Sequence, residues 1–537
     1  MRRSVFILLI SVPLLFGIVA LLLGQDSNWD LRNYHWYNAY ALLHDRLEMD
    51  MGAAQIPTFY NPALDLPFFL AADLLSAKPY SFLLGALQGC NFILLYMIAV
   101  RVLKIESPRM QTAASAAIAF VGMIGAGQMA QVGAAFYDNI VSLFIFAAIL
   151  VVLHNKNMLE RGSFPRALSW AALAGFLVGF AVGLKLPTQI FAVGVCFGLL
   201  FIPGPFVRRF FLSFICGLGV IGGFALSGGW WMWYLWAHFG NPLFPYFNDV
   251  IHSLWALPAS YRDDRFLPKT LVEAVLLPFR LFVDAKVGGE IAFRDARILG
   301  AYVILVATAV MLLIKRLEKT ETVTPPFADV FAARYLAAVA ALSYAVWLKL
   351  FGIYRYALPL EMLAPLIVVA CLAFWPVRRQ RQLSLAIGVL GFMVITMQPG
   401  DWGRKPWAPG LGGKLVDVTV PPINDPANTL VLMTGFAPTS FVIPAFPPEI
   451  PFLRPHSYLV APGDPTKFNE VMNNRIVAHQ GNVLLVRARW ETWPVEKVLP
   501  GLGLRLVPES CRPLPANLDD ELELCGLTKA VPLSAEP

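Results

Sequence analysis

Charged residues are scarce in this chain of 537 residues: Asp, Glu, Lys and Arg make up 14% of it, whereas soluble domains contain roughly 25%. Hydrophobic residues make up 57% of the chain, and the mean hydropathy is +0.62. This composition excludes an ordinary soluble domain and a disordered chain. It predicts an α-helical polytopic membrane protein.

Common motifs for nucleotide and metal chemistry are also missing. The chain contains no P-loop, no glycine fingerprint for dinucleotides, no HExxH and no CxxC pair. Their absence argues against an ATP-driven transporter and against a site for nucleotide sugars. No internal repeat is visible either, although paired repeats are typical of secondary transporters.

Cysteine is rare, with six in the chain. Four of the cysteines lie in apolar segments, where a thiol acts as a small hydrophobic group: Cys90, Cys196, Cys216 and Cys371. Cys511 and Cys525 lie in the polar tail. If the tail is in an oxidising compartment, a disulfide between these two is favoured over two free thiols.

Eleven apolar runs have about the length that a membrane crossing requires. They cover about 4–23, 80–100, 112–131, 139–153, 167–184, 189–203, 210–231, 298–314, 330–350, 357–375 and 384–398. We therefore expect about eleven transmembrane helices. No small-x-small cleavage site follows the run at 4–23, so we expect this helix to be retained.

Basic residues fall in every second connection between these runs. The basic connections contain Arg2, Arg101, Lys156, Arg208, Lys315, Lys319 and Arg378. Because basic connections stay in the cytoplasm, the pattern predicts a multi-pass protein of the inner (plasma) membrane. The N-terminus would be cytoplasmic and the C-terminus periplasmic or extracellular. The net charge of +7 is then the cytoplasmic excess of basic residues, and no nucleic acid partner is expected.

Three large segments would then lie outside the cytoplasm. Two are loops, at 25–79 and 232–297, of a transmembrane domain that covers residues 1–398. The third is the tail at 399–537, which is polar and rich in proline. Alternating apolar runs in the tail predict strands of a small α/β domain; they lie at 429–433 and 482–487.

The first outer loop opens with the sequence WDLRNYH at 29–35, which combines an acid, a base, an imidazole and aromatic rings. At a membrane surface such a cluster is either an interfacial anchor or a site. Asp30 is the first candidate for a catalytic base, because nearby apolar rings could raise the pKa of its carboxyl group. A helix cap, for a helix from Asp30 to Leu47, is the alternative. Asp26 is a rival base, and His35 is a candidate for substrate binding or for an interfacial hydrogen bond.

Three further polar residues lie at the predicted outer ends of apolar runs. Asp138 precedes the run at 139–153, where it could hold a sugar hydroxyl or a metal ion, or cap the helix. Lys185 and Arg355 occur in the sequences GLKLPT and YRYALP, on the side where basic residues are unusual. A lipid-linked phosphate would suit both. The alternatives are side chains that only reach the interface and an Arg355–Glu361 pair.

Together these features resemble the GT-C superfamily of integral membrane glycosyltransferases, which includes protein mannosyltransferases and lipid A aminoarabinose transferases. The resemblance rests on the early acid Asp30, the second-loop acid Asp138, the late sequence Arg355-Tyr356-x-x-Pro359 and the outer tail. The stretch from Gly240 to Asn248 resembles one in uncharacterised bacterial members. Several members have an Asp-Glu pair in the first loop, whereas Leu31 follows Asp30 here.

The resemblance implies transfer of a sugar from a polyprenyl-phosphate donor to an extracytoplasmic glycolipid, polysaccharide or protein. Asp30 would be the catalytic base. The residues implied to bind substrate are His35, Asp138, Lys185, Arg355 and Tyr356, with a divalent metal ion possible at Asp138. A polymerase or ligase of surface polysaccharide, a secondary transporter and a non-catalytic receptor remain as alternatives.

Overall fold

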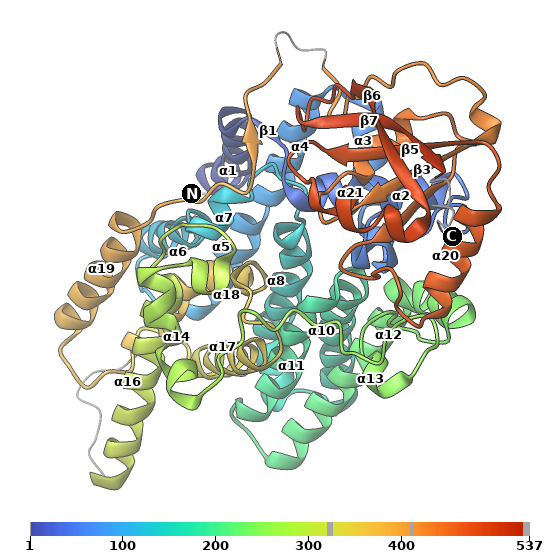
Figure 1. Ribbon diagram of the computed structural model, residues 1–537. Helices are drawn as coiled ribbons and strands as arrows, with labels where there is room; N and C mark the ends of the chain where they lie inside the picture. The colour runs from blue at the N-terminus through green and yellow to red at the C-terminus, as the bar shows by residue number, and fades with distance from the viewer. Residues whose placement is uncertain (1, 319–325, 409–412, 530–537) are drawn as a thin grey trace, which may run out of the picture. The chain divides into compact units, whose positions relative to one another are not determined.

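The computed structural model describes residues 2–318, 326–408 and 413–529 (Figure 1). The chain forms two compact units. Unit 1 is formed by Met1–Leu23, Ser81–Gly229 and Asp263–Trp402, and unit 2 by Gly24–Tyr80, Trp230–Arg262 and Gly403–Pro537. Three predicted cytoplasmic basic groups lie outside the described part: the side chains of Arg2 and Lys315 and the whole of Lys319.

Unit 1 is helical. Its helices are α1 (Arg2–Leu23), α4 (Ala77–Gly89), α5 (Asn91–Val102), α6 (Pro108–Met123), α7 (Ala126–Ala130), α8 (Asp138–His154), α9 (Lys156–Arg161), α10 (Phe164–Leu184), η4 (Leu186–Thr188), α11 (Gln189–Gly198), η5 (Leu199–Phe201), α12 (Phe206–Phe239), α14 (Leu271–Val283), α15 (Lys286–Gly289), α16 (Arg297–Glu318), α17 (Val330–Leu350), η6 (Tyr354–Ala357), α18 (Leu358–Leu372) and α19 (Arg379–Ile395). Helices α4 and α12 also contribute residues to unit 2.

Seven helical stretches in the described residues are long and apolar enough to cross a membrane. They are Ser4–Leu23, Ala77–Val102, Phe164–Leu184, Phe206–Phe239, Arg297–Ile314, Val330–Leu350 and Tyr354–Leu372. This set is that of a multi-pass membrane protein. Four other predicted runs form helices of at most 17 residues. For example, the run at 112–131 stops at Met123, because the backbone becomes extended at Gly125 before α7 begins.

Helix α18 is the central helix of unit 1, since 94% of the apolar stretch Tyr354–Leu372 is buried, against 28% for Ser4–Leu23. It packs against α6, α8, α16 and α17. The approach of α6 is so close that a Cβ atom at Gly122 would overlap the carbonyl oxygen of Met362. Glycine therefore permits the backbone contact that positions α18, whose first turn carries part of the site described below.

Small residues also join α10 to α12. A Cβ atom at Gly175 or Gly179 of α10 would overlap the carbonyl oxygen of Cys216 or Val220 of α12. In the reverse direction, a Cβ atom at Gly223 would overlap a carbonyl oxygen of α10. Lipid provides no hydrophobic driving force between helices, so such close backbone packing is a main source of their association.

Unit 2 contains a mixed five-stranded sheet in the order β4-β3-β5-β7-β6 (Figure 1). The strands are β3 (Thr429–Thr434), β4 (Phe452–His456), β5 (Asn482–Ala488), β6 (Leu504–Pro513) and β7 (Leu522–Lys529). The two tail strands expected from alternating residues are confirmed as β3 and β5. Strands β4, β3 and β5 are parallel, and β7 pairs antiparallel with β5 and β6.

The remaining elements of unit 2 are short. They are β1 (Gln25–Asp26), η1 (Leu31–His35), α2 (Trp36–Leu43), η2 (Ile56–Phe59), η3 (Pro62–Leu64), α3 (Leu66–Leu74), α13 (Asn248–Ile251), β2 (Arg404–Lys405), η7 (Pro426–Asn428), η8 (Ser440–Ala445), α20 (Lys467–Ala478), α21 (Trp493–Lys497) and η9 (Pro500–Leu502). The single helix predicted from Asp30 to Leu47 is instead a π-helical turn followed by α2, and it ends at Leu43.

A buried ion pair joins the first loop to the sheet. Arg46 forms two hydrogen bonds with Asp50, each 2.8 Å long, and the side chains are 2% and 0% exposed. Asp50 Oδ1 also accepts the N–H of Phe452 in β4 at 2.8 Å, and Asp50 Oδ2 accepts the hydroxyl of Tyr37 at 3.0 Å. Burial raises the pKa of the Asp50 carboxyl group, although Arg46 opposes that shift.

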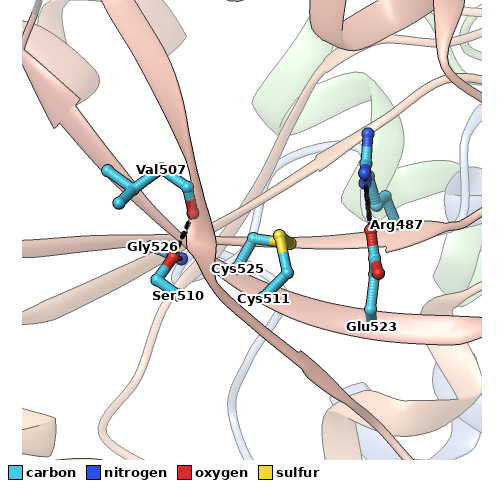
Figure 2. The surroundings of a disulfide bond; sticks show 7 residues. All are labelled: Arg487, Val507, Ser510, Cys511, Glu523, Cys525 and Gly526. Atoms are coloured by element: carbon cyan, nitrogen blue, oxygen red, sulfur yellow. Dashed lines mark hydrogen bonds and ion pairs between the residues drawn. A yellow bond between two sulfur atoms is a disulfide. The ribbon is translucent and has the colours of Figure 1, made fainter.

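Cys511 and Cys525 form a disulfide across strands β6 and β7 (Figure 2). The bridge that the sequence favours is therefore confirmed. Its two sulfur atoms lie with Glu523 in the one group of three potential metal ligands among the described residues. Because the sulfurs are bonded to each other, this group is a structural cross-link rather than a metal site.

Candidate functional site

A small depression in unit 1 brings together four of the residues predicted to bind substrate. It is partly open to solvent and is lined by Asp138, Val141, Ile145, Pro187, Thr188, Phe191, Arg355, Tyr356 and Pro359. Lys185 is the fourth predicted residue, and its ammonium group contacts Asp138. The depression combines one end of α8, the η4–α11 connection and the η6–α18 connection. We call these lining residues and Lys185 the cation pocket.

Two cations in the cation pocket share aromatic partners. Arg355 lies over the rings of Phe136 and Tyr356, with its guanidinium carbon 5.2 and 5.1 Å from the ring centroids. Lys185 Nζ is 5.9 Å from the centroid of the same Tyr356 ring and donates a 2.7 Å hydrogen bond to the carbonyl oxygen of Phe136. Both cations therefore lie against aromatic rings, and Lys185 is also held by a backbone carbonyl oxygen.

Each cation also has a carboxylate partner. Lys185 Nζ is 2.7 Å from Asp138 Oδ1, and Arg355 Nε is 3.4 Å from Glu290 Oε2. Glu290 is more exposed than Asp138, with 29% of its side-chain area accessible against 5%. The Arg355 pair is thus the longer and wetter of the two, and an incoming anion would displace Glu290 more easily than Asp138.

Asp138 lies at the first helical residue of α8, and Tyr137 before it adopts the left-handed conformation, with φ of +61°. Such a backbone costs a non-glycine residue about 1 kcal/mol or more, and it is common at functional sites. Within the described residues Asp138 Oδ2 has no hydrogen-bond partner, although it is buried. That oxygen is consequently able to accept from a ligand hydroxyl.

Glu361 is not the partner of Arg355, so the structural pair considered from the sequence is wrong. The Glu361 carboxylate accepts the N–H groups of Gly127 and Gln128, at 3.1 and 2.9 Å, and the hydroxyl of Tyr354 at 2.6 Å. A buried carboxylate at the start of α7 matches the exposed amides and the dipole there. Glu361 therefore holds α7 against α18.

Asp30 and His35 belong to unit 2, in a second group of polar residues. Asp30 Oδ2 accepts a 2.9 Å hydrogen bond from Tyr34. His35 Nδ1 is 2.6 Å from Asp65 Oδ1, and both side chains are buried. A carboxylate only accepts, so an ionised Asp65 fixes the imidazole proton on Nδ1 and leaves Nε2 as the basic nitrogen.

The helix-cap alternative for Asp30 is wrong. Its side chain makes no capping hydrogen bond in the described structure; instead Asn28 Oδ1 accepts the N–H of Leu31 at 2.8 Å. Asp26, the rival base, accepts the backbone and side-chain N–H groups of Asn28 at 3.0 and 2.8 Å. Asp26 thus orders the turn before the helix, whereas Asp30 contacts a tyrosine hydroxyl.

Three residues of this second group are not identified by the sequence analysis. They are Asp65, Tyr60 and Tyr246: the Tyr60 ring meets Tyr34 edge-on at 5.2 Å, and its hydroxyl is 2.6 Å from that of Tyr246. Tyr246 belongs to the stretch 240–248 that contributes to the family resemblance. We call Asp30, Tyr34, His35, Tyr60, Asp65 and Tyr246 the acid–tyrosine group.

A divalent metal ion at Asp138 stays a prediction. Among the described residues, Asp138 is not part of a group of three Asp, Glu, His or Cys side chains. One carboxylate beside a lysine is a weak set of protein ligands for a metal ion. Mg²⁺ can nevertheless bind through one carboxylate together with substrate phosphate. No step proposed below depends on a metal.

Comparison with known proteins gives no relative: no family model, no curated protein and no solved structure matches the chain.

Proposed function

We propose that this chain is a membrane glycosyltransferase of the GT-C type. It would move a sugar from a polyprenyl-phosphate donor to an acceptor outside the cytoplasm, as an enzyme of the cell envelope. The proposal includes about eleven membrane-crossing helices, a cytoplasmic N-terminus and an outer tail.

The cation pocket is the observation that carries this proposal. Lys185 and Arg355 provide two positive groups next to one tyrosine ring, that of Tyr356. The pocket lining also contains the apolar side chains of Val141, Ile145 and Phe191. A ligand that matches both the cations and the apolar side chains has an anionic head and a hydrocarbon chain. A polyprenyl phosphate has both, and arginine suits phosphate oxygens particularly well.

The cations would act most strongly when the donor bond breaks. As the acceptor hydroxyl attacks the anomeric carbon, the bond from that carbon to the phosphate oxygen cleaves, and the polyprenyl phosphate leaves with an additional negative charge. The side chains of Lys185 and Arg355 are each 11% exposed, and they would stabilise this charge more strongly than fully exposed cations could. The apolar side would retain the lipid product.

The acid–tyrosine group would supply the base that takes the acceptor proton. Asp30 is the first candidate, and its contact with Tyr34 orients the carboxylate. His35, with Asp65 on its Nδ1, is the second, because an imidazole ordered by a carboxylate is a common general base. Either residue would contribute about 10²–10⁴-fold to the rate.

The chain segments that make up unit 2 support the proposed membrane topology. Residues Gly24–Tyr80 and Trp230–Arg262 fold together with the tail into one unit. They contain the whole of the first loop, 25–79, and the first part of the second, 232–262, that the basic-residue pattern predicts outside the cytoplasm. A common compartment for all three segments is the simplest arrangement that permits this folding.

Lipid-phosphate binding by the purified chain tests the pocket. The probes are a short-chain polyprenyl phosphate and the corresponding polyprenol, with Lys185→Gln and Arg355→Gln as variants. Lys349→Gln, which changes an exposed lysine of α17, is the matched control. We expect the phosphate to bind at least tenfold more tightly than the alcohol, and both pocket variants to lose most of that difference. Equal binding of the two probes to the parent would contradict the proposal.

A further inference from the structure

The carboxyl ends of the three parallel strands form a second potential site, on the sheet of unit 2. Thr434 and His456 are the last residues of β3 and β4, and they are paired in the register of the sheet. The chain after β3 leads to β4 on one side, whereas the chain after β4 leads through α20 to β5 on the other side. Ligands of open α/β sheets commonly bind at such a change of direction.

Both terminal residues have a buried polar atom without a partner. Thr434 is 4% exposed and His456 is 6% exposed. Within the described part of the chain, Thr434 Oγ1 and His456 Nδ1 have no hydrogen-bond partner. Buried polar atoms in native proteins are nearly always satisfied. Two such atoms on adjacent strand ends therefore indicate a ligand that hydrogen-bonds there.

Exposed aromatic side chains lie against the His456 ring. The rings follow one another in the order Tyr458, Phe436, His456 and Trp493, with successive centroids 4.4, 5.1 and 4.9 Å apart. Tyr458 and Trp493 are 55% and 50% exposed, and Phe436 is 37% exposed. The site therefore presents a row of aromatic rings, tilted or edge-on to one another, beside buried hydrogen-bonding groups. We call these four residues and Thr434 the strand-end aromatic site.

Two buried or partly buried charged side chains hold the backbone of the strand-end aromatic site just after β3. Glu491 accepts the N–H groups of Phe436 and Ala437 at 2.7 and 3.2 Å. Arg454, which is fully buried, donates to the carbonyl oxygens of Gly435 and Ala437 at 3.0 and 3.1 Å. The positive φ of Gly435, +85°, permits the tight turn between these contacts. Such a site is ordered before any ligand arrives.

We propose that the strand-end aromatic site binds a carbohydrate chain. Sugar rings would stack through their apolar C–H faces on Trp493 and Tyr458, while their hydroxyl groups would bond to His456 and Thr434. A purely hydrocarbon partner would leave both buried polar atoms unsatisfied, at a cost of about 1–3 kcal/mol each. A single sugar ring has both an apolar C–H face and hydroxyl groups that form hydrogen bonds.

Two features favour a neutral or weakly charged saccharide. Burial, with Arg454 nearby, lowers the pKa of the His456 imidazole, so this ring is neutral near pH 7 and can donate or accept. The cationic Arg454 is itself engaged by backbone carbonyl oxygens. If the proposed function holds, this saccharide is the acceptor, and the acceptor class is then a glycan. That last identification rests on the proposed function, whereas binding itself does not.

Binding of the full-length protein to immobilised oligosaccharides tests this inference. The protein is purified in a detergent without a sugar head group, because maltoside head groups would compete. The probes are neutral, N-acetylated and uronic-acid oligosaccharides, with an array of unrelated peptides in parallel. Trp493→Ala and Tyr458→Ala remove exposed rings, so both variants are expected to fold. Val477→Ala, on the exposed face of α20, is the control for a loss of apolar surface.

We expect at least one class of oligosaccharide to bind the parent. Trp493→Ala and Tyr458→Ala should each weaken that binding at least tenfold, whereas Val477→Ala should not change it. The inference fails if no class binds the parent more strongly than Trp493→Ala, or if only peptides bind. The variants Lys185→Gln and Asp30→Asn should still bind the oligosaccharide. A failure of the proposed transfer is therefore distinguishable from a failure of this site.

Discussion

Lys185 Nζ lies 2.7 Å from Asp138 Oδ1, so a cation at the end of α10 and an acid at the start of α8 meet in one depression. Both side chains are largely buried. Removal of either one therefore leaves the other as a buried charge without its partner, which lowers the stability of the folded state. We expect Asp138→Asn and Lys185→Gln to be coupled, so that the double variant loses about 1–3 kcal/mol less stability than the sum of the two single variants. Unfolding in mixed micelles measures the coupling. Additive losses would mean that the pair is not formed.

Helix packing at Gly179 gives a prediction with a matched control on the neighbouring helix. Gly179→Ala places a methyl group against the carbonyl oxygen of Val220, so we expect a loss of about 1–3 kcal/mol from overpacking. Gly217→Ala, on α12, meets no atom within 4 Å and should leave the protein unchanged or slightly more stable. Thermal unfolding of the three purified proteins compares them. Similar melting temperatures for both variants would refute the close packing of α10 and α12.

Asp50→Ala tests the ion pair that joins the first loop to the sheet. The substitution leaves Arg46 buried and without its carboxylate, so we expect unit 2 to lose about 3–5 kcal/mol of stability. Asp520→Ala removes an exposed partner of Lys405, with 79% of the aspartate side chain accessible, and should cost no more than about 1 kcal/mol. Resistance to proteolysis of the tail reports both effects. If the two variants were equally resistant, the buried pair would contribute little.

The pH dependence of unit 2 should contain a contribution from His456. The pKa of this histidine is lowered in the folded state by burial and by Arg454, with Asp464 acting in the opposite direction. The unfolded chain therefore binds the proton more readily, and stability is lost as the pH falls below about 6.5, the ordinary pKa of histidine. His456→Gln should lose less stability than the parent between pH 7.5 and pH 5. Parallel pH profiles would contradict this assignment.

The sequence predicts those parts that depend on local pattern. Alternating residues predict β3 and β5. The oxidising compartment expected for the tail predicts the Cys511–Cys525 bridge, and basic residues on the side expected to be outer single out Lys185 and Arg355. The structure places both Lys185 and Arg355 next to the ring of Tyr356.

Side-chain contacts between residues far apart in the sequence cannot be predicted from local patterns. Asp65 and Glu290 stand in stretches without a motif, so nothing local connects them with His35 and Arg355. The strand-end aromatic site was missed for a similar reason, since its residues follow three different strands and only the sheet order brings them together. Hydropathy also overestimates helix length where glycine or a turn ends the helix, as at Gly125.

Sugar transfer is the most direct test of the account. Membranes that contain equal amounts of folded parent or of Asp30→Asn receive labelled polyprenyl-phosphate sugars, and the label in extracytoplasmic glycan, glycolipid and protein is measured. His35→Gln and Asp26→Asn are assayed beside them.

We predict transfer by the parent and a loss of at least about a hundredfold in Asp30→Asn, as for a general base, with little change in Asp26→Asn. Transfer by Asp30→Asn at the parental rate would contradict the role of Asp30. The absence of transfer by the parent from every donor, with polyprenyl phosphate no better bound than polyprenol, would contradict the transferase itself.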